Sequence, residues 1–226
     1  MEANKNTPLG VRIFDRIADK YEFTAKFVSF GILPYWLRNL IKTLPYKGEK
    51  ILDIACGTGI LFPELSKRFD YVVGLDYSLP MLKQAQKKGL KNTSLVRGDA
   101  LKLPFKEETF STVVISLGLR HFPDTETALR EAHRVLKKDG TIHILEVGIP
   151  KNPLLRKLFL LFLKRVVLPL GKLRAKEDVY EHLFGSIINF PHYEELLKLF
   201  TRLGFSQAQY KTLMGGIAVI YTAKKV

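Results

Sequence analysis

Hydrophobic and polar positions along the chain predict short strands that alternate with helices. Five apolar runs have the length and composition of strands: residues 51–55, 71–75, 94–96, 112–117 and 141–146. Three segments between these runs show apolar positions at helical spacing: residues 60–69, 79–88 and 125–136. Strands that alternate with helices indicate a mostly parallel sheet covered by helices on both faces.

The N-terminal end departs from this alternation. Residues 11–44 predict two helices, broken at Gly31 and Pro34. Phe14 and Tyr21 belong to a set of side chains at helical spacing, and we expect part of that face to be buried.

The C-terminal end departs from it as well. Pro191 is expected to open a helix that stops at Gly204. Residues 205–211 and 216–223 then predict two strands that form an antiparallel hairpin at the sheet edge, which makes seven strands in all.

Composition indicates one globular domain and leaves the partner open. With 226 residues, the chain is long enough to bury a substantial core, and its single cysteine excludes an internal disulfide. The polar N-terminus has no apolar signal core, so we expect a cytoplasmic protein. The net charge of +14 fits a lysine-rich solvated surface, a nucleic-acid partner or an anionic membrane face.

The distribution of this charge is uneven. Residues 151–176 contain eight Lys or Arg and no acidic residue, and they surround the apolar run 158–163. The run is too short to span a bilayer. It fits a helix that lies on a membrane surface, a helix that walls an apolar pocket, or one that packs on its own sheet or on a second copy of the chain.

A glycine-rich turn after the first strand is the strongest local signal. Residues 53–59 end a strand with Asp53 and open a helix after Gly57, Thr58 and Gly59. The dinucleotide fingerprint is not met, because position 62 is Phe. The pattern instead resembles the acidic, glycine-rich motif of methyltransferases, in which the acid holds the ammonium of a methionine moiety. Cys56 has no evident base beside it, and we interpret it as a small packing residue.

Further acids end the next two strands. Asp76 can accept both ribose hydroxyls of a nucleoside. Its alternative role is to cap the following helix, for which Ser78 is the better candidate. Asp99 and Ala100 follow the third strand, where a methyltransferase binds the adenine amino group.

Together with Ser116 after the fourth strand, these matches occur in the order found in class I S-adenosylmethionine-dependent methyltransferases, which have a Rossmann-like α/β fold. The resemblance implies ten cofactor-binding residues: Asp53, Gly57, Thr58, Gly59, Asp76, Tyr77, Met81, Asp99, Ala100 and Ser116. It implies no metal.

Several segments resemble the ubiquinone/menaquinone-biosynthesis C-methyltransferase family more closely. Residues 11–21 are similar to that family's F-x-x-I-A-x-x-Y-D signature, with Glu22 in place of the final Asp. Residues 116–121 are similar to its S-F-G-L-R-N motif, with His121 in place of Asn. Residues 152–155, 168–172 and 215–217 also match, while the segment at Tyr221 differs from the family's usual ending.

This resemblance implies transfer of a methyl group to a ring carbon of a prenylated quinol. Deprotonating the neighbouring hydroxyl makes that carbon nucleophilic. Arg120 is expected to stabilise the phenolate, His121 to relay or accept the proton, and Tyr21 to complete the hydrogen-bond set. Asp124 is the alternative partner of Arg120, and Tyr21 is alternatively a core residue. His133 and His143 lie within a helix and a strand, and we interpret them as structural.

The resemblance also divides the single domain, residues 1–226, into four segments. Residues 1–46 form a helical lid, 47–147 the cofactor-binding core, 148–190 a basic and apolar helical insertion, and 191–226 a helix with the edge strands. A prenyl tail implies a membrane source, so the insertion is expected to contact the inner face of an anionic membrane. A homodimer is the other partner considered.

Three alternatives remain on the sequence alone. One is a methyltransferase for another small lipophile, and another is a protein that binds the cofactor without catalysis. A nucleic-acid methyltransferase fits the charge, but the chain lacks the Asn/Asp-Pro-Pro-aromatic motif of base methylation and an appended binding domain.

Overall fold

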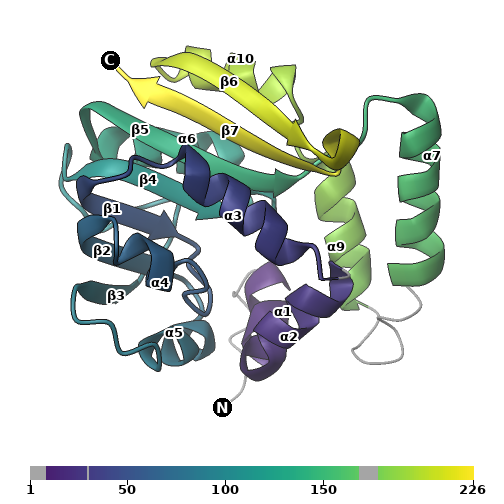
Figure 1. The fold of residues 1–226 in the computed structure, drawn as a ribbon, viewed down its shortest axis with the longest axis horizontal. Helices are drawn as coiled ribbons and strands as arrows, with labels where there is room; N and C mark the ends of the chain where they lie inside the picture. The colour runs from purple at the N-terminus through teal and green to yellow at the C-terminus, as the bar shows by residue number, and fades with distance from the viewer. Residues whose placement is uncertain (1–8, 30, 168–177) are drawn as a thin grey trace.

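The computed structural model describes residues 9–29, 31–167 and 178–226, which form one seven-stranded sheet flanked by helices (Figure 1). The order of the strands across the sheet is β3-β2-β1-β4-β5-β7-β6. Their bounds are β1 Gly48–Ile54, β2 Phe69–Asp76, β3 Thr93–Arg97, β4 Phe110–Ser116, β5 Leu136–Val147, β6 Phe205–Leu213 and β7 Ala218–Lys225. Strands β1 to β5 are mutually parallel, and β7 runs antiparallel to both β5 and β6. The predicted fold class is confirmed.

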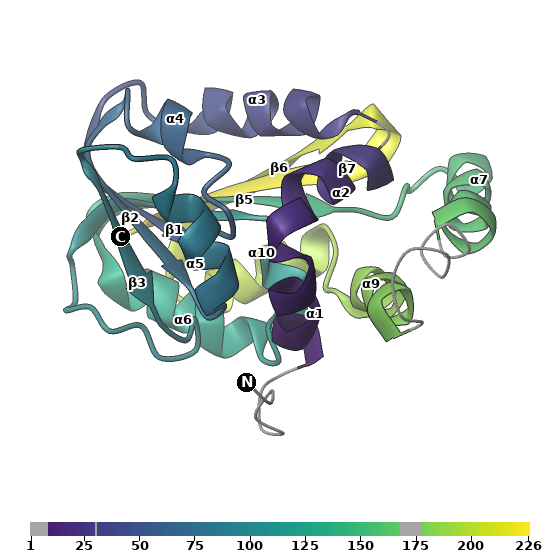
Figure 2. The same cartoon turned by 90° about the horizontal axis from the view of Figure 1, so that it is seen from below.

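Helices cover both faces of this sheet (Figure 2). One face buries α6 and α10, and the other buries α3, α4 and α5. The helices before the sheet are α1 Leu9–Ile17, η1 Ala18–Lys20, α2 Tyr21–Val28 and α3 Leu33–Thr43. Those within it are α4 Phe62–Leu65, α5 Leu79–Gln86, η2 Leu119–His121 and α6 Thr125–Val135. The remaining ones are α7 Pro153–Phe162, η3 Leu163–Val167, α9 Asp178–Asn189, α10 Glu194–Arg202 and η4 Met214–Gly216.

Two predicted helices differ from the observed ones. The helix expected at residues 60–69 is only the single turn α4, because Phe69 already pairs with Gly48 in the β1–β2 ladder. The helix expected from Pro191 begins at Glu194. Tyr193 interrupts it with φ of 54° and donates its backbone N–H to the Tyr221 hydroxyl at 2.9 Å, so the buried tyrosine fixes a kink before α10.

The predicted helix break at Gly31 is confirmed, whereas the break predicted at Pro34 is wrong. Gly31 has φ of 76°, a conformation that favours glycine. Pro34 does not break a helix but lies in the first turn of α3, where its missing N–H costs no hydrogen bond. Ser78 caps α5 as predicted, because its hydroxyl accepts a bond from the backbone N–H of Met81.

Within the described residues, the basic and apolar insertion contains α7, which continues into η3, and α9, and α7 and α9 lie beside each other beyond the end of the sheet (Figure 1). Phe159, Leu163 and Ile187 join them in a small apolar cluster. The matches at residues 168–172 lie outside the described residues. Among those described, no helix is both long and apolar enough to cross a membrane.

Candidate active site

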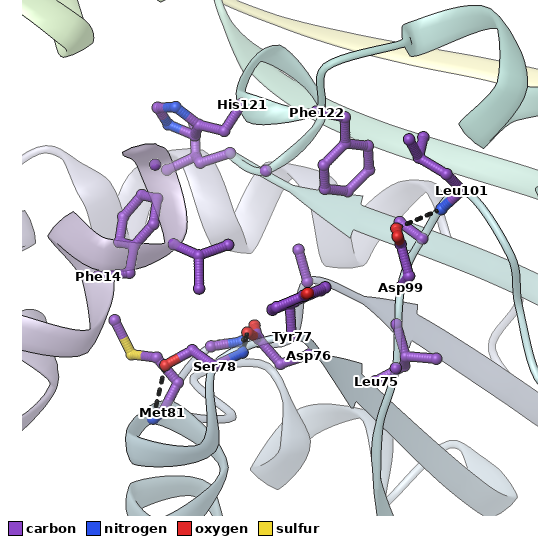
Figure 3. A pocket seen from close by; sticks show the side chains of 18 of the residues that line it. Phe14, Leu75, Asp76, Tyr77, Ser78, Met81, Asp99, Leu101, His121 and Phe122 are labelled. Carbon is purple, nitrogen blue, oxygen red and sulfur yellow. Dashed lines mark hydrogen bonds between the residues drawn. The ribbon is translucent and has the colours of Figure 1, made fainter. Parts of the chain in front are cut away.

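A pocket opens at the carboxyl ends of β1, β2 and β4, beneath α1 (Figure 3). It contains about 880 Å³ of space, part of it open to solvent. Seven residues of the predicted cofactor set line this pocket: Gly57, Asp76, Tyr77, Met81, Asp99, Ala100 and Ser116. Two predicted catalytic residues, Tyr21 and His121, line it as well.

The turn after β1 is built from backbone in the left-handed region. Ala55, Gly57 and Gly59 have φ of 57°, 54° and 72°. A Cβ on Gly59 would lie 2.5 Å from the ring of Phe62, a buried residue of α4, so that ring leaves no room for a larger residue there. Gly59 therefore shapes the turn and does not line the pocket, whereas Gly57 exposes its backbone to it.

Asp53 is a buried carboxylate at the end of β1. It is 2% exposed and lines a smaller cavity that shares Gly57 and Ser116 with the main pocket. Its Oδ1 has no hydrogen-bond partner within the part of the chain that the structure describes. Burial, and then the charge of Asp76, raise the pKa of Asp53 well above its usual range. An ammonium group at this position would supply the missing partner and restore the ionised form.

Asp76 ends β2 and connects the glycine turn to the pocket. Its Oδ2 accepts the Gly57 backbone N–H at 2.8 Å, and its Oδ1 accepts the Ser78 backbone N–H at 2.8 Å. Burial raises its pKa, and these two bonds oppose the rise. Each carboxylate oxygen keeps a second lone pair, so Asp76 can still accept a pair of ribose hydroxyls.

Asp99 and Ala100 also line the pocket, and Figure 3 shows Asp99 close to Leu101. The Oδ1 of Asp99 accepts the Leu101 backbone N–H at 2.9 Å, which orients the carboxylate. Ala100 is buried. An exposed acceptor beside a flat apolar wall is suited to an adenine ring with its amino group.

Aromatic side chains form the other end of the pocket. The Phe14 ring meets the His121 ring edge to face with centroids 5.1 Å apart, and it meets the Tyr21 ring at 6.0 Å. Phe122 also lines the pocket, on the side of Leu101 and Asp99 (Figure 3). Burial raises the pKa of Tyr21, and the Arg120 guanidinium opposes the rise, so Tyr21 is a hydroxyl donor at neutral pH. This end can hold a planar ring. Sequence reasoning identified the position of Phe14 only as core, and it missed Phe122.

Arg120 does not line the pocket but is paired with Glu146. Its Nη1 donates to Glu146 Oε2 at 2.6 Å and to the Leu117 carbonyl at 2.8 Å. The alternative pairing with Asp124 is wrong, because Asp124 caps α6 by accepting the Thr127 N–H. Sequence reasoning missed Glu146. Its signal was a lone acid at the end of an apolar strand.

Thr58 also points away from the main pocket. Its hydroxyl donates to Glu22 Oε1 at 2.9 Å, and Lys88 pairs with the same carboxylate at 2.8 Å. Glu22, which stands where the family has Asp, therefore connects the lid helix α2 to the glycine turn and to the residues after α5.

Cys56 and His143 are surrounded by groups that indicate a structural role. Burial, with the charges of Asp76 and Asp53, raises the pKa of the Cys56 thiol well above its usual range, which fits a packing residue. His143 lies between the hydroxyls of Thr43 and Thr141, each 3.0 Å away, and burial lowers its pKa to about 4. The described residues contain no group of His, Cys, Asp and Glu able to hold a metal ion.

Comparisons with known proteins identify the family of the chain. A family model described as the ubiE/COQ5 methyltransferase family matches residues 2–225. Demethylmenaquinone methyltransferases from Staphylococcus aureus strains JH9 and Newman are 37% identical over 221 residues, which cover 95% of this chain and 92% of theirs.

Solved structures share the fold. A methyltransferase from Thermotoga maritima, described as SAM-dependent and a possible histamine N-methyltransferase, has a TM-score of 0.70 at 21% identity and covers 95% of this chain and 99% of its own. DhpI in complex with SAH has a TM-score of 0.70 at 20% identity, and the match covers 96% of this chain and 95% of the DhpI chain. The chain therefore belongs to the ubiE/COQ5 methyltransferase family, as an enzyme that uses S-adenosylmethionine.

Proposed function

We propose that the enzyme methylates a ring carbon of a prenylated quinol in menaquinone or ubiquinone biosynthesis. One observation supports this most directly. A single pocket joins a polar end at Asp76 and Asp99 to an end walled by Phe14 and His121. The names of the Staphylococcus aureus relatives point to demethylmenaquinol as the acceptor.

The polar end has groups that fit each part of the cofactor. Asp53 would accept the methionine ammonium, Asp76 the ribose hydroxyls, and Asp99 the adenine amino group. When bound, S-adenosylmethionine supplies a methylsulfonium, which is already a strong electrophile. The protein therefore has to orient the acceptor and exclude water. Phe14 and Tyr21, from the N-terminal helices, would close the aromatic end of the pocket.

The aromatic end would activate the acceptor. A neutral ring carbon is a poor nucleophile, and removing the proton of a neighbouring hydroxyl places charge on it. His121 lines the pocket where it can take that proton, and the Tyr21 hydroxyl can donate to the resulting oxygen. Arg120 would stabilise the phenolate by its charge and through the Leu117 turn, since its guanidinium does not line the pocket.

A methyl-transfer assay tests this function. Purified enzyme, S-adenosylmethionine and short-tailed demethylated quinols should give S-adenosylhomocysteine and a quinol in which a methyl group replaces a ring hydrogen, which is released as a proton; mass spectrometry locates the methyl group on the ring. A sterol, a fatty acid and a phospholipid serve as competing lipophilic acceptors, and an RNA tests the nucleic-acid alternative. Turnover of one of these with none on any quinol would contradict the proposal.

The partner of the insertion is part of the same proposal. Leu154, Leu158 and Leu161 are spaced i, i+4 and i+7 on α7 and are all exposed. Exposed Lys157, Lys164 and Arg165 flank them. An apolar stripe with a basic border is suited to an anionic lipid surface, from which a prenylated substrate would be collected. The expected location at the cytoplasmic face of a membrane follows from this contact.

Vesicle sedimentation distinguishes the possible occupants of this stripe. Anionic vesicles should pull the protein down more strongly than neutral ones, and added salt should weaken the binding. A protein that stays in the supernatant with both vesicles but elutes as a dimer in light scattering would show that a second copy covers the stripe instead.

A further inference from the structure

Glu146 is a fully buried carboxylate that has no part in the reaction described so far. It ends β5 and is 0% exposed. Its Oε1 accepts the backbone N–H of Arg120 at 3.2 Å, and its Oε2 accepts both the Arg120 Nη1 and the backbone N–H of Val147. One carboxylate thus binds the backbone and the side chain of the same arginine.

Arg120, held by Glu146, in turn binds the backbone of the pocket wall. Its Nη1 donates to the carbonyl of Leu117, which has φ of 57°, an unusual conformation for leucine. A Cβ on the next residue, Gly118, would lie 2.8 Å from the Cβ of Ala55, so the turns after β4 and β1 are in close contact. Ser116, Leu117 and Gly118 all line the main pocket. The position of this wall therefore depends on the Glu146–Arg120 pair.

A purely structural role explains the pair poorly. Buried ion pairs are weak stabilisers, because desolvating two charges offsets their attraction, and apolar residues of similar size stabilise a core as well. The charge pair lies directly behind the end of the pocket at which an acceptor hydroxyl must ionise. Buried charges at this place alter the ionisation of the acceptor hydroxyl, whereas buried leucines would not.

The charges around this end are few among the described residues. Those that act on Tyr21 are Arg120, Asp76, Glu146 and Glu22, and the charge of Glu146 also acts on His192 and Tyr221. Arg120 is the one cation in this set. Glu146 is therefore the group that directly offsets the positive charge beside the ring.

We propose that Glu146 is a positioning residue for methyl transfer, which holds the turn 116–118 through Arg120 and limits the positive charge beside the acceptor ring. This inference rests on the proposed quinol substrate. Without the carboxylate, the uncompensated guanidinium lowers the pKa of the nearby acceptor hydroxyl, so the ionised form is reached at lower pH. At the same time the turn loses its anchor, and the acceptor is less well oriented.

Two substitutions test the proposal, with a matched control elsewhere. Glu146→Gln keeps the shape and removes the charge, whereas Glu146→Asp keeps the charge on a shorter side chain. Glu131→Gln is the control, because Glu131 also pairs with an arginine, Arg134 at 2.7 Å on α6, in a pair that is partly exposed. Glu131 does not line the pocket.

For Glu146→Gln we expect kcat to fall about 10- to 100-fold, as misplacement of an acceptor by an ångström does. The rising limb of the pH–rate profile should move to lower pH, while S-adenosylmethionine binds by calorimetry with an affinity within about threefold of wild type. Glu146→Asp should restore the profile of the wild type with part of its kcat. Glu131→Gln should change neither.

A crystal structure of the Glu146→Gln variant gives a readout without turnover, in which the Arg120 bond to Leu117 and the turn 116–118 should have changed. A folded Glu146→Gln enzyme with the kcat, pH profile and turn of the wild type would overturn the inference. If Glu146→Gln does not fold, Glu146→Asp must show the lower kcat with an unshifted profile. A wild type that methylates no quinol, beside a rearranged turn in the variant, would overturn only the proposed substrate.

Discussion

The carboxyl edge of the sheet and the helix α7 reverse the usual distribution of residues in opposite ways. At the sheet edge Asp53 is 2% and Glu146 0% exposed, whereas on α7 Leu154 is 69% and Leu158 54% exposed. Acids are rarely buried unless they are paired, and neighbouring exposed leucines mark contact surfaces. The first region offers a small molecule a charge shielded from water, and the second offers an apolar surface to something large.

The two regions also differ in how they are held. The edge is fixed by backbone groups, since Asp76 binds two N–H groups and Glu146 binds another two. The α7 region meets α9 through the small cluster around Phe159. Changes at the edge should therefore alter folding, cofactor binding or turnover, depending on the residue, and changes on α7 should alter surface contacts alone.

The largest effect is expected for Arg120→Met. It leaves the Glu146 carboxylate buried without its cation, and losing one partner of a buried pair costs about 3–5 kcal/mol of unfolding free energy. Urea denaturation measures this. The double variant Arg120→Met with Glu146→Leu should recover most of the loss, because no charge is left buried. Equal stability of wild type and the single variant would show that this pair is not buried as described.

Asp53→Asn is expected to act next most strongly, and on binding. Losing a charged acceptor for the ammonium should weaken S-adenosylmethionine binding about 100-fold, or about 2.7 kcal/mol. The free protein should become more stable than wild type. The folded pKa of Asp53 is raised, so wild type loses stability as pH rises from the unfolded pKa towards the folded one.

Calorimetry with the cofactor and thermal melts across pH measure both effects of Asp53→Asn. The stability difference between variant and wild type should grow as pH rises above about 4 and then level off. A variant that binds the cofactor like wild type would remove Asp53 from the site.

A smaller effect is expected for Glu22→Gln in the lid. Burial would raise the Glu22 pKa, but hydrogen bonds from Lys88 and Thr58 outweigh it and lower the pKa. The ionised carboxylate therefore helps close the lid above the ordinary pKa of Glu, and this help is lost as pH falls through the lowered value. Removing the charge at neutral pH should cost at most about 1 kcal/mol, because the pair with Lys88 is partly exposed.

Stopped-flow release of the cofactor measures the lid. Glu22→Gln should release it a few-fold faster than wild type at pH 7, and acidifying the wild type below the lowered pKa of Glu22 should approach the same rate, provided that it stays folded. A release rate that is independent of both changes would mean that the lid does not control exchange.

The smallest effect on stability is expected on α7. Leu158→Ser with Leu161→Ser should change the unfolding free energy by no more than about 0.5 kcal/mol for each site, because both side chains are exposed. Binding to anionic vesicles should nevertheless be lost. Tyr46→Ser is the control, since Tyr46 is 88% exposed in the connection between α3 and β1 and should leave vesicle binding unchanged.

Most of the strand pattern and the strand-end acids could be predicted from local sequence. Apolar runs and a glycine turn depend on neighbouring residues, so the sequence alone locates Asp53, Asp76 and Asp99 at the ends of strands. The pair of Arg120 with Glu146 could not be predicted in this way. The two residues are 26 positions apart, and only the parallel pairing of β4 with β5 brings them together.

The same reason accounts for the other errors. The start of α10 depends on the contact of Tyr193 with Tyr221, 28 positions away, and the orientation of Thr58 depends on Glu22, 36 positions away. Neither contact leaves a local pattern. From the local sequence, Pro191 predicted the start of the helix, and the glycine-rich turn predicted that Thr58 binds the cofactor.

By itself, the sequence determined the order of strands and helices and which acids end the strands, because burial periodicity and turn chemistry are local properties of the chain. Only the tertiary structure decided which of those acids face a pocket, which accept backbone N–H groups, and that the arginine expected at the substrate is paired behind the wall. These are matters of distance between segments far apart in the chain, and they follow from how the sheet pairs its strands and where the lid packs on them.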